Sequence, residues 1–280
     1  MNLYSAKQDG KYHMNANSTY LIGKDHISCE DYALAWSNPQ SKNGLAIVCD
    51  GCSASSDVDF GARILAKSAE NIVLMDGDDS AISDDANVFG TKVIFNAKRI
   101  FEILPTLHPN ALDCTLLVAR VTNDKKLIAF MYGDGVLVHR TQSSVNTVHI
   151  SLTSGAPDYL SYQLHADRYY AYKAWEDNVK QIACTNYGKT IQVSEKPLTP
   201  YVLKCDVSEG DVIAVISDGI NSFRKSDNEP IPWTDLVDEF TGFKNFEGEF
   251  VQRRIAAFKR KCLKEGITHS DDISVASIFV

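Results

Sequence analysis

The sequence lacks the features of a membrane or nucleic-acid-binding protein. It has no apolar run near the roughly 18 residues of a membrane span, and its start, MNLYSAKQDGKYH, contains no apolar stretch typical of a signal peptide. Basic side chains are in the minority, with 28 Lys and Arg against 36 Asp and Glu and a formal net charge of −8. Neutralising phosphates requires clustered Lys and Arg. We therefore expect a cytoplasmic protein without a membrane or nucleic-acid partner, monomeric by default and more suited to binding cations.

The sequence also lacks a linker and a disulfide pattern. No Gly/Ser-rich or Pro-rich stretch divides its 280 residues, and 44% of them are hydrophobic. A chain of this size buries roughly three quarters of its unfolded surface and needs no covalent staple. Its 7 cysteines are odd in number and scattered, unlike a secreted disulfide scaffold. Cys49 and Cys52 form a CxxC, for which we favour a structural role over a redox or zinc role. We expect residues 1–280 to form one domain.

Hydrophobic periodicity predicts an α+β arrangement. Two helices are expected early, from about Asp57 and over 83–104, and one late, over 246–263. Between and after them we expect antiparallel strands over 45–49, 115–121, 126–132, 136–139, 145–152, 201–207, 212–217 and 273–280. The stretch around 155–187 is rich in tyrosine and is expected to be an elaboration on this core. Its tyrosines either pack that segment or select a substrate.

Acidic residues recur at the ends of the predicted strands. Three strands end in Asp-Gly and two further acidic pairs precede strands, namely Asp50-Gly51, Asp134-Gly135, Asp218-Gly219, Glu30-Asp31 and Asp271-Asp272. A single Asp-Gly is an ordinary turn. Strand ends can converge in space, however, and gathered carboxylates repel one another unless a cation binds them. Oxygen ligands without histidine favour Mg²⁺ or Mn²⁺ over zinc.

Two such ions held by shared carboxylates form a site for hydrolysis of a phosphoryl group. The sequence contains neither Gly-x-Ser-x-Gly nor a Walker A motif to suggest other chemistry.

At these residues the chain resembles the metal-dependent type 2C (PPM-type) Ser/Thr protein phosphatases, especially compact bacterial members. The matching motifs, in order, are Glu30-Asp31, Asp50-Gly51, Asp113-Cys114-Thr115-Leu116-Leu117, Gly133-Asp134-Gly135, Ser217-Asp218-Gly219-Ile220 and Asp271-Asp272-Ile273-Ser274-Val275. Each motif is weak alone, but the ordered set over about residues 17–280 is specific. The resemblance implies a four-layer α-β-β-α sandwich with two central antiparallel sheets.

The resemblance also implies a site and a reaction. Asp50 would bridge two Mn²⁺ or Mg²⁺ ions, the Gly51 carbonyl would hold one of them, and Asp218 and Asp271 would bind the other. Phosphoserine or phosphothreonine in a protein substrate would be hydrolysed by water activated at this two-metal centre, without a phosphoenzyme.

The same resemblance implies supporting roles for other residues. Glu30 would act on the metals directly or through water, Asp31 would support the site, and Asp134 would belong to a looser third-metal site. His26 stands where many members carry a phosphate-binding arginine, with Lys24 nearby. His26 would bind substrate phosphate or donate a proton, unless it is a loop histidine without a role.

Two further positions depart from the family pattern. Members often continue Asp-Gly with His-Gly, whose histidine can act as general acid, whereas Cys52-Ser53 follows here. Ser222 stands where some members carry another acidic ligand of the third metal. A protein phosphatase is the main hypothesis. A regulatory or binding module on the same fold, and a phosphoesterase for small molecules, are the alternatives.

Overall fold

Two antiparallel sheets form the centre of the molecule. The structure is a computed structural model that describes residues 14–38, 40–75, 85–186 and 188–280. The seven-stranded sheet has the order β1-β14-β11-β6-β7-β8-β9 and the five-stranded sheet the order β10-β5-β4-β3-β2. The strands of the first are β1 (Asn15–Leu21), β6 (Gly135–Arg140), β7 (Val145–Leu152), β8 (Lys180–Asn186), β9 (Lys189–Glu195), β11 (Val212–Ile216) and β14 (Ile273–Phe279). Those of the second are β2 (Tyr32–Asn38), β3 (Asn43–Cys49), β4 (Leu116–Val121), β5 (Lys126–Tyr132) and β10 (Tyr201–Asp206).

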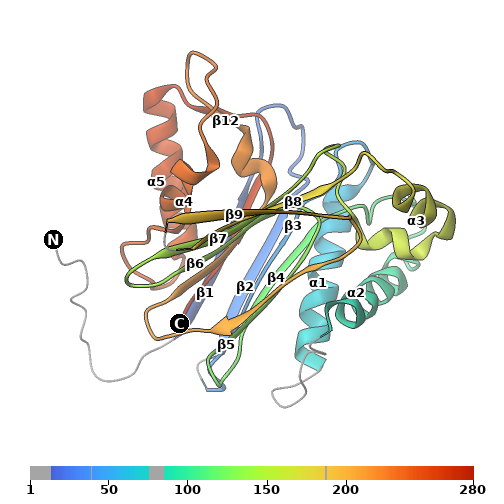
Figure 1. Cartoon of the computed structure of the whole chain (residues 1–280), viewed down its shortest axis with the longest axis horizontal. Helices are drawn as coiled ribbons and strands as arrows, with labels where there is room; N and C mark the ends of the chain where they lie inside the picture. The colour runs from blue at the N-terminus through green and yellow to red at the C-terminus, as the bar shows by residue number, and fades with distance from the viewer. Residues whose placement is uncertain (1–13, 39, 76–84, 187) are drawn as a thin grey trace.

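Helices cover the outer face of each sheet (Figure 1). On the five-stranded sheet lie α1 (Val58–Met75) and α2 (Ala86–Phe101), and on the seven-stranded sheet lie α4 (Trp233–Thr241) and α5 (Phe250–Glu265). A third apolar cluster fills the space between the sheets with side chains such as Val48, Leu117 and Ile213. The expected α-β-β-α sandwich is confirmed. No helix of the described residues is long and apolar enough to cross a membrane.

The early helices follow from their sequences. In α1 the buried residues Val58, Ala62, Leu65 and Ala69 recur at helical spacing and face the sheet. Helix α2 begins after Asp85, whose carboxylate accepts hydrogen bonds from two backbone N–H groups of the first turn. The helix predicted over 83–104 is therefore shorter within the described residues, and the predicted residues 83 and 84 lie outside them.

Several elements were not predicted. The late part of the chain holds two helices rather than one, because α4 has only 9 residues and gives a short periodic signal. Strand β9 is exposed along its whole length, and β1 is half-buried throughout, so neither shows the alternation that marks a strand. The predicted strands over 45–49, 115–121, 126–132, 136–139, 145–152, 201–207, 212–217 and 273–280 correspond to β3, β4, β5, β6, β7, β10, β11 and β14.

The Tyr-rich stretch projects beside α2 (Figure 1). It contains the 3₁₀ helix η1 (Leu160–Leu164) and helix α3 (Ala166–Lys173) before the chain enters β8. The remaining short elements are the 3₁₀ helix η2 (Asp218–Ser222) and a two-stranded sheet of β12 (Phe223–Arg224) and β13 (Thr268–His269).

Candidate active site

Strand pairing gathers the acidic residues at one edge of the sandwich. Tyr32 at the start of β2 pairs with Cys49 at the end of β3, so Asp31 and Asp50 lie at the same end of the five-stranded sheet. In the seven-stranded sheet Ile216 at the end of β11 pairs with Val275 near the start of β14. The residues that follow β11 and precede β14, among them Asp218 and Asp271, therefore share an edge as well.

The loop after β3 is fixed by the start of β4. The Thr115 N–H donates to the Asp50 carbonyl at 2.8 Å, and the Asp50 N–H donates to the Thr115 hydroxyl at 3.2 Å. At Gly51 a Cβ would lie 2.8 Å from the Cβ of Val58 and 2.9 Å from the Glu30 carbonyl oxygen. A side chain is therefore excluded at Gly51, and the backbone there packs directly against the Glu30 loop.

Asp31 is a buried carboxylate held by the opposite sheet. It is 1% exposed, and its Oδ2 accepts a hydrogen bond from the Ser217 hydroxyl at 2.7 Å. The same hydroxyl accepts from the Ser274 N–H at 2.9 Å, which ties the ends of β11 and β14 together. Burial raises the pKa of Asp31 to about 7, against the lowering effect of its hydrogen-bond donors. Its Oδ1 has no hydrogen-bond partner among the described residues.

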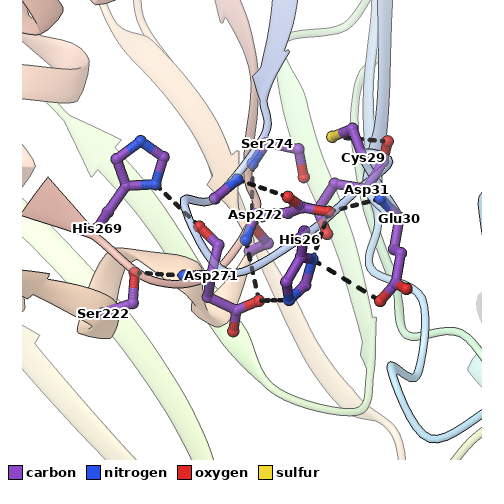
Figure 2. Close-up of polar contacts among 11 residues, drawn as sticks. His26, Cys29, Glu30, Asp31, Ser222, His269, Asp271, Asp272 and Ser274 are labelled. Carbon is purple, nitrogen blue, oxygen red and sulfur yellow. Dashed lines mark hydrogen bonds and ion pairs between the residues drawn. The ribbon is translucent and has the colours of Figure 1, made fainter.

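His26 lies among three carboxylates (Figure 2). Its Nδ1 is 3.0 Å from Asp272 Oδ2 and 3.8 Å from Glu30 Oε2, and its Nε2 is 3.4 Å from Asp271 Oδ1. Burial alone would lower the pKa of His26, but the three carboxylates outweigh it and raise the pKa above 6.5. The ring therefore stands at the carboxylate edge, in a loop between β1 and β2.

Asp272 organises that loop. It is 1% exposed, and its carboxylate accepts hydrogen bonds from the backbone N–H groups of Gly23, at 2.7 Å, and of Glu30. Its neighbour Asp271 is different, since 41% of the Asp271 side chain is exposed. The acidic pair before β14 thus supplies one buried anchor and one accessible carboxylate.

Mutual repulsion marks the carboxylates at this edge. Burial raises the pKa of Asp50 well above its ordinary range, and the charges of Asp31, Asp218 and Asp271 raise it further. Burial also raises the pKa of Asp271 to about 6, with Asp218 as the next cause. Asp134 lies between β5 and β6 and is 8% exposed. Burial raises its pKa strongly, with Asp218 again the next cause.

The oxygen atoms available at this edge are of the type that binds a hard cation. They are carboxylate oxygens, and Asp31 Oδ1, Asp134 Oδ1 and Glu30 Oε2 are buried without a hydrogen-bond partner among the described residues. A cation would remove the repulsion that raises the pKa values of Asp50 and Asp271. Nevertheless, no three His, Cys, Asp or Glu side chains of the described ranges lie close enough together to hold one ion as they stand.

Two other residues noted in the sequence make backbone contacts near this edge. Lys24 is exposed, and its backbone N–H donates to the His269 carbonyl oxygen at 3.1 Å. Ser222 donates from its hydroxyl to the Gly219 carbonyl oxygen at 2.8 Å and accepts from the Asp271 N–H at 3.3 Å, so it supports the turn before β14.

Comparison with known proteins identifies the family. The sequence profile described as "Protein phosphatase 2C" matches residues 22–258. The chain belongs to the protein phosphatase 2C family. This membership confirms the resemblance drawn from the motifs and supports a Ser/Thr protein phosphatase, a hydrolase class that acts on phosphorylated proteins. No curated protein matches the chain.

Solved structures of phosphatases share the fold of this phosphatase 2C chain. The serine/threonine phosphatase PstP/Ppp of Mycobacterium tuberculosis superposes with a TM-score of 0.55 at 12% identity, over 96% of this chain and 99% of the other. The S. agalactiae serine/threonine phosphatase gives 0.51 at 18% identity, over 96% and 100%. PppA, described as a key regulatory component of T6SS in Pseudomonas aeruginosa, gives 0.50 at 14%, over 95% and 97%. At these identities the likeness establishes the fold.

Three supporting residues of this phosphatase 2C chain were not predicted from its sequence. Asp272 and Ser217 lie inside recognised motifs, but only the pairing of β11 with β14 makes them anchors of the loop and of Asp31. Asp113 is 3% exposed and receives the Arg168 guanidinium at 2.6 Å and the Ser161 hydroxyl at 2.6 Å, both from the Tyr-rich stretch. Its carbonyl oxygen accepts from the Cys52 N–H at 2.9 Å, so that stretch is tied to the Asp50 loop.

Proposed function

We propose that this phosphatase 2C chain hydrolyses phosphoserine and phosphothreonine in proteins at a centre of two divalent cations. The observation that best supports the proposal is that strand pairing brings the acidic motifs to one edge of the sandwich, where burial and the charges of Asp218 and Asp271 raise the pKa of Asp50. We further propose that residues 1–280 form one domain, with the Tyr-rich stretch as its elaboration.

The proposed ligands come from several parts of the chain. Asp50 would be shared by two Mn²⁺ or Mg²⁺ ions, one also held by the Gly51 carbonyl and the other by Asp218 and Asp271. Bound there, such cations supply a water of lowered pKa and neutralise charge on the phosphoryl group. Glu30 would contribute directly or through water, and Asp134 would belong to a weaker third position.

The chain's own residues would prepare the site for substrate. Ser217 fixes Asp31, whose charge adds to burial in raising the pKa of the nearby Asp50 carboxyl. Asp272 orients His26, because its carboxylate lies 3.0 Å from Nδ1 and leaves Nε2 turned toward Asp271. We propose that His26 Nε2 contacts the substrate phosphate or holds a proton for the leaving oxygen, with Lys24 as a nearby cation for the phosphate.

A metal-dependent assay tests this function. Phosphothreonine peptides and an aryl phosphate should be hydrolysed in Mn²⁺ or Mg²⁺ and not in excess EDTA. Asp50→Asn should lower kcat at least about a hundredfold, because electrostatic stabilisation of the transition state is usually the largest catalytic contribution. Its unfolding transition should match that of the wild-type protein. Asp177→Asn, which removes an exposed carboxylate on the Tyr-rich stretch, is the matched control. Full activity in EDTA, or in Asp50→Asn, would contradict the proposal.

Two alternatives would give different results in the same assay. A binding module on this fold would hydrolyse neither substrate in either cation. A phosphoesterase for small molecules would turn over nucleotides or aryl phosphate and leave the phosphopeptides intact.

A further inference from the structure

A cavity lies between α2 and the Tyr-rich stretch, beside the proposed active site. Its volume is about 580 Å³, and Asn87 and Thr91 of α2 line one side of it. Aromatic rings line much of the rest, contributed by Tyr132, Tyr159, Tyr162, Tyr169 and Tyr170. Most of these rings belong to the stretch whose role the sequence left open between packing and substrate selection.

The only charged side chain among the described residues of the cavity wall is an aspartate. No Lys, Arg or His of the described chain lines it, whereas Asp158 does. The Asp158 side chain is 5% exposed, and its Oδ2 receives Lys180 Nζ at 3.0 Å and the Leu198 N–H at 2.8 Å. Its Oδ1 has no hydrogen-bond partner among the described residues. Lys180 offsets the charge of Asp158, and Oδ1 is covered by protein atoms, so Asp158 makes the wall acidic without offering a direct ligand atom.

The tyrosine faces provide the second part of a cation site. Aromatic faces attract ammonium and guanidinium groups within about 6 Å of the ring centre. Two rings of the cavity already face a cation of the chain itself. The Arg168 guanidinium lies 4.9 Å from the centre of the Tyr162 ring, and Lys173 Nζ lies 6.0 Å from the centre of the Tyr169 ring. Arg168 is committed to Asp113 at 2.6 Å. Tyr170, which is 65% exposed, is the ring most accessible to a ligand.

Tyr159 connects the cavity to the carboxylate edge. It lines the cavity, and burial is the main cause that raises the pKa of its hydroxyl. It also lies close enough to the carboxylate edge for Asp50 and Asp134 to raise that pKa further. A second cavity of about 620 Å³ shares Asn87 and Pro200 with the first and is also lined by Asp85. Among its described lining residues there is again no Lys, Arg or His. The two cavities therefore adjoin, and each has one aspartate in its described lining.

We propose that the Tyr-lined cavity binds the ammonium or guanidinium group of a lysine or arginine in the phosphoprotein substrate. This assignment rests on the proposed function, and it narrows the substrates to phosphoproteins with a basic residue near the phosphorylated one.

A peptide series tests the assignment. Phosphothreonine peptides would carry one lysine, or norleucine of similar length, at each position from five before to five after the phosphothreonine. At one or two positions lysine should raise kcat/KM by about five- to tenfold through a lower KM, the range expected for a cation against aromatic rings. The absence of such a position, or equal gains at every position, would overturn the proposal.

Matched variants place the effect in the cavity. Asn87→Lys puts a positive charge in the wall shared by both cavities, and Val88→Lys puts one at the next position of α2, outside both linings. Tyr170→Ala removes a ring that is 65% exposed, so the fold should be kept. Asn87→Lys and Tyr170→Ala should reduce the lysine preference below twofold without changing aryl phosphate turnover, and Val88→Lys should keep it. A preference that survives Asn87→Lys would overturn the assignment.

A binding measurement separates this proposal from the proposed function. N-acetyl-lysine amide, but not N-acetyl-norleucine amide, should shift tyrosine ring resonances of the wild-type protein and not those of Asn87→Lys. If no phosphate ester is hydrolysed, the proposed function fails, whereas absence of the lysine-specific shift overturns the cavity site. If the amide binds as tightly as the best phosphopeptide, the cavity takes free amines and the substrate assignment is wrong.

Discussion

The two adjacent aspartates before β14 should respond to truncation in opposite ways. In metal-free protein, Asp272→Ala is expected to destabilise the fold strongly, while Asp271→Ala is expected to change its stability little. The reason is burial, since Asp272 is 1% exposed whereas 41% of the Asp271 side chain is exposed. The sequence alone presents them as an equivalent acidic pair.

The cost of Asp272→Ala follows from its hydrogen bonds. The carboxylate accepts from the N–H groups of Gly23 and Glu30, both of which would lose their acceptor. A buried donor left without an acceptor costs about 1–3 kcal/mol, so the free energy of unfolding should fall by about 2–5 kcal/mol. Asp272→Asn keeps one carbonyl oxygen and should lose about half as much.

Asp271→Ala removes a charge that the metal-free fold does not favour. Burial and Asp218 raise the pKa of Asp271 from 3.8 to about 6. Because the folded-state pKa is raised, the stability that this group gives below pH 4 is lost as the pH rises through about 6. The shift corresponds to at most about 3 kcal/mol, which solvent screening of the exposed side chain reduces to about 1 kcal/mol. That gain offsets the lost hydrogen bond from the Asp272 N–H, so the net change should stay within about 1 kcal/mol.

Urea unfolding at pH 8 in excess EDTA measures both variants. The chelator removes cation binding, so the comparison reports only the interactions within the chain. Equal losses for Asp271→Ala and Asp272→Ala, or a larger loss for Asp271→Ala, would refute the reasoning. Asp272→Asn should fall between wild type and Asp272→Ala, which checks that the acceptor atoms carry the effect.

Two further substitutions test the electrostatics elsewhere. Burial lowers the pKa of His149 below 6.5, against the raising effect of Asp218, and its ring stacks on Trp233 at 4.7 Å. The stability that neutral His149 gives above pH 6.5 is lost as the pH falls, so His149→Phe should gain more over wild type at pH 5.5 than at pH 8 in urea unfolding. An equal gain at both pH values would contradict this. Arg168→Met leaves the buried Asp113 carboxylate without its guanidinium partner at 2.6 Å and should cost about 2–3 kcal/mol of unfolding free energy. A loss below about 0.5 kcal/mol would mean that solvent already screens the pair.

The family and the sandwich could be predicted because their signals are local. A strand that is buried on both faces, such as β3, gives a continuous apolar run that ends at the acidic residue following it. The ordered set of such ends was enough to identify the family, and the fold agrees with that identification. Strand β9 was missed because all of its residues are exposed, and α4 because it is short.

The supporting residues could not be predicted because their roles depend on partners far away in the sequence. Asp272 accepts from Gly23 across 249 positions, and Ser217 donates to Asp31 across 186. Nothing in the acidic pair before β14 tells which carboxylate is buried. The assignment of metal ligands at Asp50, Asp218 and Asp271 stays a prediction, because it requires the cations themselves.

Position 52 explains how this chain departs from the common phosphatase 2C pattern. Where members often carry a histidine after Asp-Gly, this chain has Cys52, whose backbone N–H donates to the Asp113 carbonyl oxygen at 2.9 Å. A histidine instead stands on the other side of the edge, at His26, whose Nε2 is 3.4 Å from Asp271 Oδ1. The loop after Asp50-Gly51 is therefore tied through Asp113 to the elaboration that lines the cavity, and the nearby histidine belongs to a different loop. Because the two are separate, substitutions in the cavity can change substrate preference while the histidine keeps its contacts with the carboxylates.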